Sequence, residues 1–275
     1  MRVTFHGVRG SSPSASRQSH RYGGNTSSVT LEVPGQAPLL LDLGTGVAAF
    51  GRQLPPLEPF SGQALVTHLH FDHVLGLPFF EPLNRPGGRL QIYGPPQAAG
   101  GLAGAFAELV RPPYFPVKLR DLGGTIEYLE VSDDRFTVGA FDVLSRLVPH
   151  VGPTLGYRVE HDSGSVAFLS DHQAPPGLDT VADGVLELCA GVDLLVHDAQ
   201  YTPSELRAKP DWGHSSVDYA LFVAREAGAC RLALYHHDPG HGDDDIDRML
   251  ESVAPAAEVA GVAVFAAAGG MVVDL

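Results

Sequence analysis

The chain has 275 residues, 44% of them hydrophobic, and a formal net charge of −14 from 18 Lys and Arg against 32 Asp and Glu. This apolar content is enough for one large core or two stacked layers, so we expect a single domain over residues 1–275. Proteins that grip a long nucleic-acid backbone show a basic stripe, because neutralising phosphates supplies most of their affinity. No basic run occurs here, which argues against a long nucleic acid as the partner.

The first residues show no targeting signal. The opening "MRVTFHGVRG" carries charge and then a turn, and no run in the chain is long and apolar enough to cross a bilayer. We therefore expect a cytoplasmic protein with no membrane partner. Cys189 and Cys230 each lie in an apolar helix or strand pattern, so we expect two reduced, buried thiols rather than a disulfide framework.

Short β-rich runs bounded by Gly, Pro or Ser alternate with helical patterns along the chain. In the first half we predict strands at 2–6, 27–33, 38–44, 63–70 and 88–94, and helices at 44–54 and 98–110. In the second half we predict strands at 125–131, 141–150, 155–161, 165–171, 192–200 and 230–237, helices at 215–228 and from 243 onwards, and a final β pair at 262–266 and 271–275. Two strand-rich halves with no linker predict two sheets packed face to face and covered by helices, a four-layer αββα sandwich of the α/β (α+β) class.

The stretch "HLHFDH" (68–73) places three histidines and one aspartate beside apolar strand residues. Burying such groups without a partner is costly, so this density indicates a strong common partner, a metal ion. Because alternate residues of a strand share a face, we expect His68 and His70 to bind the same ion. Asp72 and His73 follow where the chain leaves the strand, and we expect them to turn towards a second ion.

Later strand ends supply the remaining ligands. His150 ends a predicted strand at the edge of a loop and would complete the first set, with His161, in a polar turn, as its rival. Asp171 ends the strand "VAFLS", where it can donate one oxygen to each ion and hold the two about 3.5–4 Å apart. The neighbouring His172 would then point to the opposite side.

The second ion still lacks one imidazole. The strand "LALY" ends in His236 and His237, and only one of two adjacent strand residues can face the site. The spacing favours His236 and leaves His237 open.

The order of these residues resembles that of the metallo-β-lactamase-fold hydrolases over nearly the whole chain. "LLVHDAQY", "WGHSSVDYALFVAREAG" and "LALYHHDP" are similar to the "HEAT", "GHST" and final metal-histidine segments of the ribonuclease Z branch, as is the opening "GVRGSSP" followed by "GGNTSSV". The resemblance implies the metallo-β-lactamase fold, two bound divalent ions, and His236 rather than His237 as the ligand.

Departures from the family pattern narrow the implied activity. The β-lactamases of this fold carry a cysteine where Asp171 stands and lack a counterpart of His73, which argues against lactam hydrolysis. Ribonuclease Z carries a tRNA-clamping arm between the segments matched by His150 and Asp171, which only 20 residues separate here. The pattern is more similar to the small-substrate phosphodiesterases of the same branch, including those that act on cyclic phosphates. Those of the phosphonate pathway often add a structural zinc on cysteines, which this chain cannot supply.

A catalytic role is expected for Asp72, His214 and Asp198. Two ions joined by Asp171 would lower the pKa of a bridging water towards neutrality, so that hydroxide can attack phosphorus. His214 in "WGHSS" begins a predicted helix and would protonate the leaving oxygen, and the resemblance implies that Asp198 keeps it protonated. We expect Asp42 to brace the metal-binding loop without being a ligand.

Several positions keep alternative roles. His214 could instead pack on Trp212, and His197 is expected to be a buried structural residue. Tyr114 and Phe115 in "VRPPYFPVKLR" could stack on a substrate or form a hydrophobic plug, and the sequence does not decide between these roles.

The leading hypothesis is a dinuclear phosphodiesterase that cleaves a small or cyclic phosphodiester. The alternatives are a ribonuclease Z-like endoribonuclease and a non-catalytic metal or oxygen sensor with the same ligands. We expect Zn²⁺, while a His/Asp set without Cys also accepts Mn²⁺ or Fe²⁺. A homodimer is suggested by the resemblance alone.

Overall fold

The computed structural model describes residues 1–98 and 100–275. Its strands are β1 (Arg2–Gly7), β2 (Ser28–Glu32), β3 (Leu39–Leu41), β4 (Ser61–Leu65), β5 (Arg89–Gly94), β6 (Thr125–Glu130), β7 (Arg135–Val138), β8 (Phe141–Leu147), β9 (Leu155–His161), β10 (Gly164–Leu169), β11 (Leu194–Asp198), β12 (Arg231–Tyr235), β13 (Ala263–Ala266) and β14 (Val272–Asp274). Its α-helices are α1 (Gly46–Gly51), α2 (Phe71–Val74), α3 (Gly101–Leu109), α4 (Asp183–Cys189), α5 (Pro203–Ala208), α6 (Val217–Ala227) and α7 (Asp243–Ala260).

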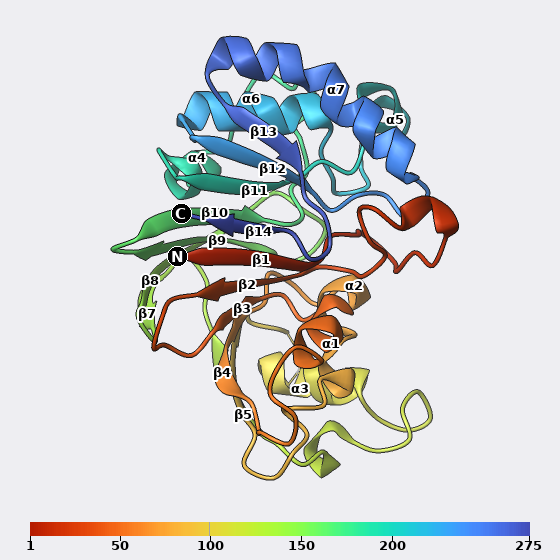
Figure 1. The fold of residues 1–275 in the computed structure, drawn as a ribbon, viewed down its shortest axis with the longest axis vertical. Coiled ribbons are helices and arrows are strands. Elements are labelled where there is room, and N and C mark those ends of the chain that lie inside the picture. The colour runs from red at the N-terminus through yellow and green to blue at the C-terminus, as the bar shows by residue number, and fades with distance from the viewer. Residues whose placement is uncertain (99) are drawn as a thin grey trace.

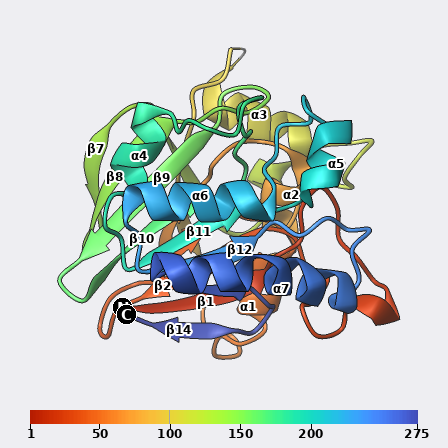
Figure 2. The same cartoon turned by 90° about the horizontal axis from the view of Figure 1, so that it is seen from above.

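Two seven-stranded sheets lie at the centre of the molecule. Their strand orders are β14-β1-β2-β3-β4-β5-β6 and β13-β12-β11-β10-β9-β8-β7. Figure 1 shows α1 and α3 on the outer side of the first sheet and α6 and α7 on the outer side of the second. Seen from above, α6 and α7 lie across the strands of the second sheet (Figure 2). The expected four-layer αββα sandwich is confirmed.

Successive strand residues point to opposite faces of a sheet. In both sheets the residues on each face are apolar, so each sheet packs on both sides. Along β10, Val166 and Phe168 join the core between the sheets, whereas Ala167 and Leu169 join the core under the helices of the second sheet. The middle residue of β3, Leu40, likewise packs with the helices of the first sheet, while its two neighbours face the second sheet. This arrangement explains why the strands read as continuous apolar runs rather than as alternating ones.

The strand directions bring the chemically interesting segments to one edge. Neighbouring strands run parallel from β3 to β6 and again from β10 to β13. Because β8 and β10 are each antiparallel to β9, these two strands also run in the same direction. The loops after β4, β8, β10, β11 and β12 carry the polar residues, at the carboxyl ends of strands where α/β proteins commonly bind ligands.

The strand predicted over 63–70 is shorter than expected, because β4 ends at Leu65. The N–H group of Thr67 donates to the Asp42 carboxylate at 2.8 Å instead of to a neighbouring strand. The chain therefore leaves the sheet five residues before the predicted end, and His68 and His70 lie on a loop rather than on a strand. Asp72 and His73 lie in the short helix α2.

The predicted final β pair is wrong in its partners. Strand β13 pairs with β12 in the second sheet, whereas β14 crosses to β1 in the first sheet. The alternating patterns of 262–266 and 271–275 identified strands but carried no information about which edge each would join. The patterns also missed β7, α2, α4 and α5, and residue 99 of the predicted 98–110 helix lies outside the described residues.

The cysteines agree with the expectation in part. Both are free thiols, and Cys189 is buried. Cys230 is exposed, which corrects the expectation of a second buried thiol, because it lies in the turn between Gly228 and the start of β12 rather than within the strand. Across the described ranges 1–98 and 100–275, no helix is both long enough and apolar enough to cross a membrane.

Candidate metal centre

Three imidazoles and one carboxylate gather where β4, β8 and β10 end. They belong to His68, His70, His150 and Asp171, and their ligand-capable atoms lie within 4.8 Å of one another. His68 Nε2 lies 2.9 Å from His70 Nδ1, and His150 Nε2 lies 3.3 Å from that same atom. His68 is buried and His70 is exposed, so the group opens to solvent on the side of His70.

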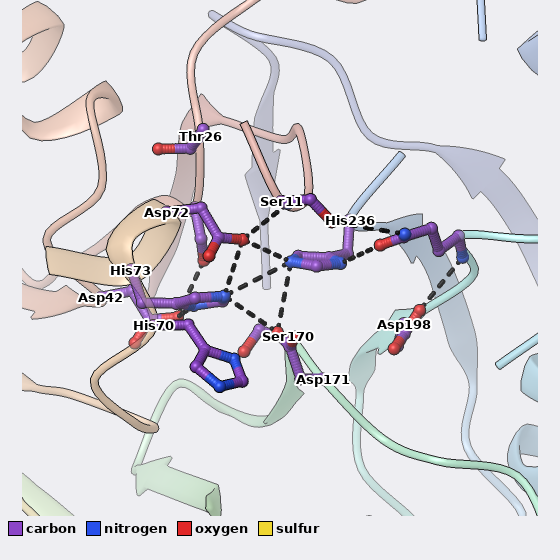
Figure 3. A network of polar contacts seen from close by, with 12 residues as sticks. Ser11, Thr26, Asp42, His70, Asp72, His73, Ser170, Asp171, Asp198 and His236 are labelled. Atoms are coloured by element: carbon purple, nitrogen blue, oxygen red, sulfur yellow. Dashed lines mark hydrogen bonds and ion pairs between the residues drawn. The ribbon is translucent and has the colours of Figure 1, made fainter. Parts of the chain in front are cut away.

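A second group adjoins the first and consists of Asp72, His73 and His236. Asp72 Oδ2 lies 3.1 Å from His73 Nε2 and 3.0 Å from His236 Nε2, and the two nitrogens are 3.3 Å apart. Figure 3 shows these side chains pointing towards one another from different parts of the chain. The N–H group of Ser11 also donates to Asp72 Oδ2, at 2.7 Å.

Asp171 lies between the two groups with one oxygen towards each. Its Oδ2 is 3.8 Å from His68 Nε2 and 3.7 Å from His150 Nε2. Its Oδ1 is 3.0 Å from His73 Nε2 and 3.3 Å from His236 Nε2 (Figure 3). This buried oxygen nevertheless makes no well-directed hydrogen bond. An unpartnered buried carboxylate oxygen is costly, so the position calls for a cation.

Oxygen acceptors fix two of the three imidazoles of the first group, those of His68 and His150, on the side away from the cluster. His150 Nδ1 donates to the carbonyl of Gly213 at 2.7 Å. His68 Nδ1 lies 3.1 Å from the Thr67 hydroxyl, which lies 3.0 Å from Asp42 Oδ1 and donates to it. Because each Nδ1 carries the proton, each Nε2 presents its lone pair to the cluster when the ring is neutral.

The second group is held in the same way. His73 Nδ1 donates to Asp42 Oδ2 at 2.7 Å, and His236 Nδ1 donates to Gln200 Oε1 at 2.8 Å. Such acceptors set the tautomer of a ligand histidine and orient its ring. Asp42 therefore occupies the bracing position expected for it, behind His73 rather than beside the cluster.

A divalent cation in each group fits this donor set. Two unprotonated imidazole nitrogens cannot hydrogen-bond each other, so the lone pairs of His68 and His70, 2.9 Å apart, need a proton or a cation between them. Imidazole nitrogens and carboxylate oxygens are ordinary ligands of Zn²⁺, Mn²⁺ and Fe²⁺. The His/Asp cluster thus has the composition of a divalent metal site.

Charge interactions within the cluster keep its carboxylates ionised. Burial lowers the pKa of His68 well below its ordinary value, and the neighbouring His73 lowers it further. Burial also opposes ionisation of Asp171, but the imidazoles of His236, His73 and His68 hold its pKa well below the usual range. Burial disfavours charge on His73 too, yet Asp72, Asp171 and Asp42 raise its pKa well above the ordinary value. The carboxylates are therefore ionised and attract cations.

His214 and Asp198 form a pair beside the cluster. His214 Nδ1 donates to Asp198 Oδ2 at 2.9 Å and lies 3.7 Å from Asp171 Oδ2. Burial lowers the pKa of His214, but the charge and hydrogen bond of Asp198, together with Asp171 and Asp72, outweigh burial and raise this pKa to about 9. His214 also lies close enough to Asp171 and His236 to belong to a ligand-capable group.

The remaining histidines lie away from the cluster. His161 bonds the Ser163 hydroxyl at the turn between β9 and β10, at the opposite end of the strand from the site. His172 and His197 form a buried pair, with Nδ1 of His172 2.9 Å from Nε2 of His197. His237 Nε2 donates to the carbonyl of Ala267 at 2.9 Å.

Tyr114 and Phe115, whose role the sequence did not decide, lie at the surface. Tyr114 is 77% exposed and stacks with Arg111, while Phe115 packs edge-on against Phe79. Both residues line a groove of about 340 Å³ that also includes Phe71, next to His70. Trp212 is exposed and lies against Lys209.

Several residues that shape the centre were not predicted from the sequence. Gly10 packs so closely that a Cβ atom there would come within 2.4 Å of His236 Nδ1, and a Cβ on Gly213 would come within 2.6 Å of His150. His236 itself adopts a left-handed backbone with φ of 61°, a conformation that costs a non-glycine residue about 1–2 kcal/mol. Gln200 carried no signal either, because it lies two residues beyond the end of β11, where the alternation of strand residues no longer applies.

The comparison with known families decides the superfamily. A profile of the beta-lactamase superfamily domain matches residues 39–237. The chain belongs to this superfamily. The uncharacterized protein Rv1339 of Mycobacterium tuberculosis is 31% identical over 224 residues, which cover 78% of this chain and 76% of that protein. Ribonuclease Z of Haloferax volcanii is 31% identical over 281 residues, covering 86% of this chain and 84% of the enzyme.

Solved structures share the fold over the whole chain. YhfI of Bacillus subtilis, a metallo-beta-lactamase fold protein, aligns with a TM-score of 0.74 at 20% identity and covers 100% of this chain and 98% of its own. Human tRNase Z, short form, gives 0.69 at 22% identity, covering 100% and 99%. A diphosphatase from the PhnP family gives 0.70 at 19% identity, covering 100% and 97%. The expected membership of the ribonuclease Z and phosphodiesterase-like branch is confirmed.

Asp42→Asn tests the bracing role of Asp42. The amide keeps the shape of the carboxylate but cannot accept all the hydrogen bonds from Ser27, Thr67 and His73. We expect metal affinity, measured by competition with a chromophoric chelator, to fall roughly 10–100-fold. The control is Asp142→Asn on the exposed face of β8, which should bind metal as the wild type does. Unchanged affinity in the Asp42 variant would refute the role.

Proposed function

We propose that the protein is a single-domain, dinuclear metal-dependent phosphodiesterase that cleaves a small or cyclic phosphodiester. The observation that carries this proposal is the placement of Asp171, with one oxygen towards each of two imidazole groups. A carboxylate shared in this way suits two cations held side by side, an arrangement that recurs in phosphatases and nucleases.

Each cation would have its own set of ligands. His68, His70, His150 and Asp171 would hold one cation, and Asp72, His73, His236 and Asp171 the other. We propose Zn²⁺ in both sites. When bound, such a pair supplies a nucleophilic hydroxide at neutral pH and stabilises the charge that develops on the phosphoryl oxygens.

His214 is proposed as the proton donor to the leaving oxygen. Its Nδ1 proton is held by Asp198, so Nε2 is the atom that can face a substrate. Because the pKa of His214 is raised to about 9, the ring carries a proton at Nε2 at neutral pH. Asp198 keeps the ring oriented and charged. Asp72 serves the reaction as a ligand that the N–H group of Ser11 holds in place.

The short segment between His150 and Asp171, where ribonuclease Z carries its tRNA-clamping arm, favours a small substrate. The segment between His150 and Asp171 consists of a short loop and the hairpin β9–β10, both strands of which are paired within the second sheet. The net charge of −14 gives a long polyanion little electrostatic attraction. Ribonuclease Z remains the second candidate function, because proteins of that name match most of this chain at 28–31% identity.

The substrate class is tested by comparing two kinds of substrate on the zinc-loaded protein. We expect hydrolysis of bis-p-nitrophenyl phosphate and of a cyclic nucleotide, and no processing of a 3′-extended precursor tRNA at the same enzyme concentration. Cleavage of the tRNA with no hydrolysis of the small diesters would favour the ribonuclease. No turnover of either, with two metals bound, would favour a non-catalytic sensor.

His214→Ala tests the proton donor, and the choice of leaving group makes the test specific. We expect a loss of ~10²–10⁴ in kcat for a diester with an alkoxide leaving group, which needs a proton. A p-nitrophenolate leaving group needs none, so its release should slow much less. The control is His161→Ala, at the far end of β9, which should turn over like the wild type.

The metal content of the His214→Ala variant shows whether His214 acts as a proton donor or as a metal ligand. The His214 variant should retain two metals per chain. Loss of one metal, or an equal loss of rate for both leaving groups, would show that His214 acts as a ligand and not as an acid.

A further inference from the structure

Gln200 is buried beside His236 of the second group. It lies two residues after the end of β11 and is 2% exposed. Its amide oxygen accepts from His236 Nδ1 at 2.8 Å, and its amide nitrogen donates to the Tyr201 hydroxyl at 3.1 Å and lies 3.4 Å from the Ser11 hydroxyl. Every polar atom of the side chain therefore has a partner, and its orientation is fixed.

The direction of this hydrogen bond determines which nitrogen of His236 faces the cluster. An amide oxygen can only accept, so His236 carries its proton on Nδ1 and leaves Nε2 unprotonated. Nε2 is the atom that lies 3.0 Å from Asp72 and 3.3 Å from Asp171. The opposite tautomer would turn an N–H group towards the position of a cation.

Gly10 closes the other side of the same hydrogen bond. A Cβ atom there would lie 2.4 Å from His236 Nδ1 and 2.6 Å from Gln200 Oε1, so a side chain at position 10 does not fit beside this hydrogen bond. The acceptor for His236 must then come from Gln200 itself. The backbone N–H group of Gln200 also donates to Asp198 Oδ1 at 3.0 Å, which ties the same residue to the pair formed by Asp198 and His214.

We propose that Gln200 is a positioning residue that prepares His236 to bind the second cation, and that it does so with a neutral acceptor. The proposal rests on the proposed dinuclear site. The other three acceptors are not equivalent, since Thr67 and Gly213 serve the first group and Asp42 is charged. Gln200 orients His236 without adding a negative charge next to Asp72, Asp171 and Asp198, and it is specific to the second group.

The test measures zinc binding to the metal-free protein by competition with a chromophoric chelator, with no substrate present. The wild type should bind two ions. Gln200→Leu removes the acceptor and should weaken one of the two ions roughly 10–100-fold while leaving the other unchanged. Gln200→Glu restores an acceptor oxygen and should recover the weakened site. Gln173→Leu is the matched control, because the amide of Gln173 bonds only the carbonyl of Pro210, at 3.5 Å.

Two results would overturn the proposal: equal affinity of the Leu variant and the wild type, or equal weakening of both ions. Failure of the Glu variant to recover the site would do the same. If the Leu variant does not fold, Gln200→Asn replaces it, since the shorter amide cannot reach His236 and the same loss at one ion is expected. A protein that binds two ions and cleaves no phosphodiester would contradict the proposed function while leaving this inference intact.

Discussion

The centre depends on one constraint, the hydrogen-bond acceptor behind four of its five imidazoles. Oxygen atoms of Thr67, Asp42, Gly213 and Gln200 accept from the Nδ1 atoms of His68, His73, His150 and His236. Each acceptor takes the Nδ1 proton, so a neutral ring presents an unprotonated Nε2 to the middle of the cluster. Several lone pairs and carboxylate oxygens then face one another in a buried volume, an arrangement that is unfavourable unless positive charge lies among them. The fold thus places these groups so that a bound cation would relieve the repulsion between them.

The fold satisfies this constraint with residues that lie far apart in the sequence. Parallel strands end at the same edge, so the loops after β4, β10, β11 and β12 meet there. The buried sheets hold these loop ends rigidly, because their apolar faces pack on both sides. The first sheet supplies Asp72 and His73, and the second supplies Asp171 and His236, so the cluster joins the two sheets. Removing cations should therefore loosen the edge between the sheets more than the strands themselves.

Much of this centre was predictable from local patterns. A dense "HLHFDH" segment and an apolar strand that ends in Asp or His are signals that a single sequence displays, and the structure brings together all seven predicted ligands. The acceptors were less visible, because the carbonyl of Gly213 or the amide of Gln200 forms no motif. Pairing between distant strands was also beyond reach, since β14 alternates like any strand and its partner β1 lies at the other end of the chain. The end of β4 depended on a side chain, Asp42, that competes for the N–H group of Thr67.

The central claim is that Asp171 joins two cations. An anomalous difference map from crystals grown with zinc and without chelator tests this most directly. The account predicts two peaks about 3.5–4 Å apart, one between His68, His70 and His150 and one between Asp72, His73 and His236, with an oxygen of Asp171 directed to each. A single peak, or two peaks that Asp171 does not join, would contradict it.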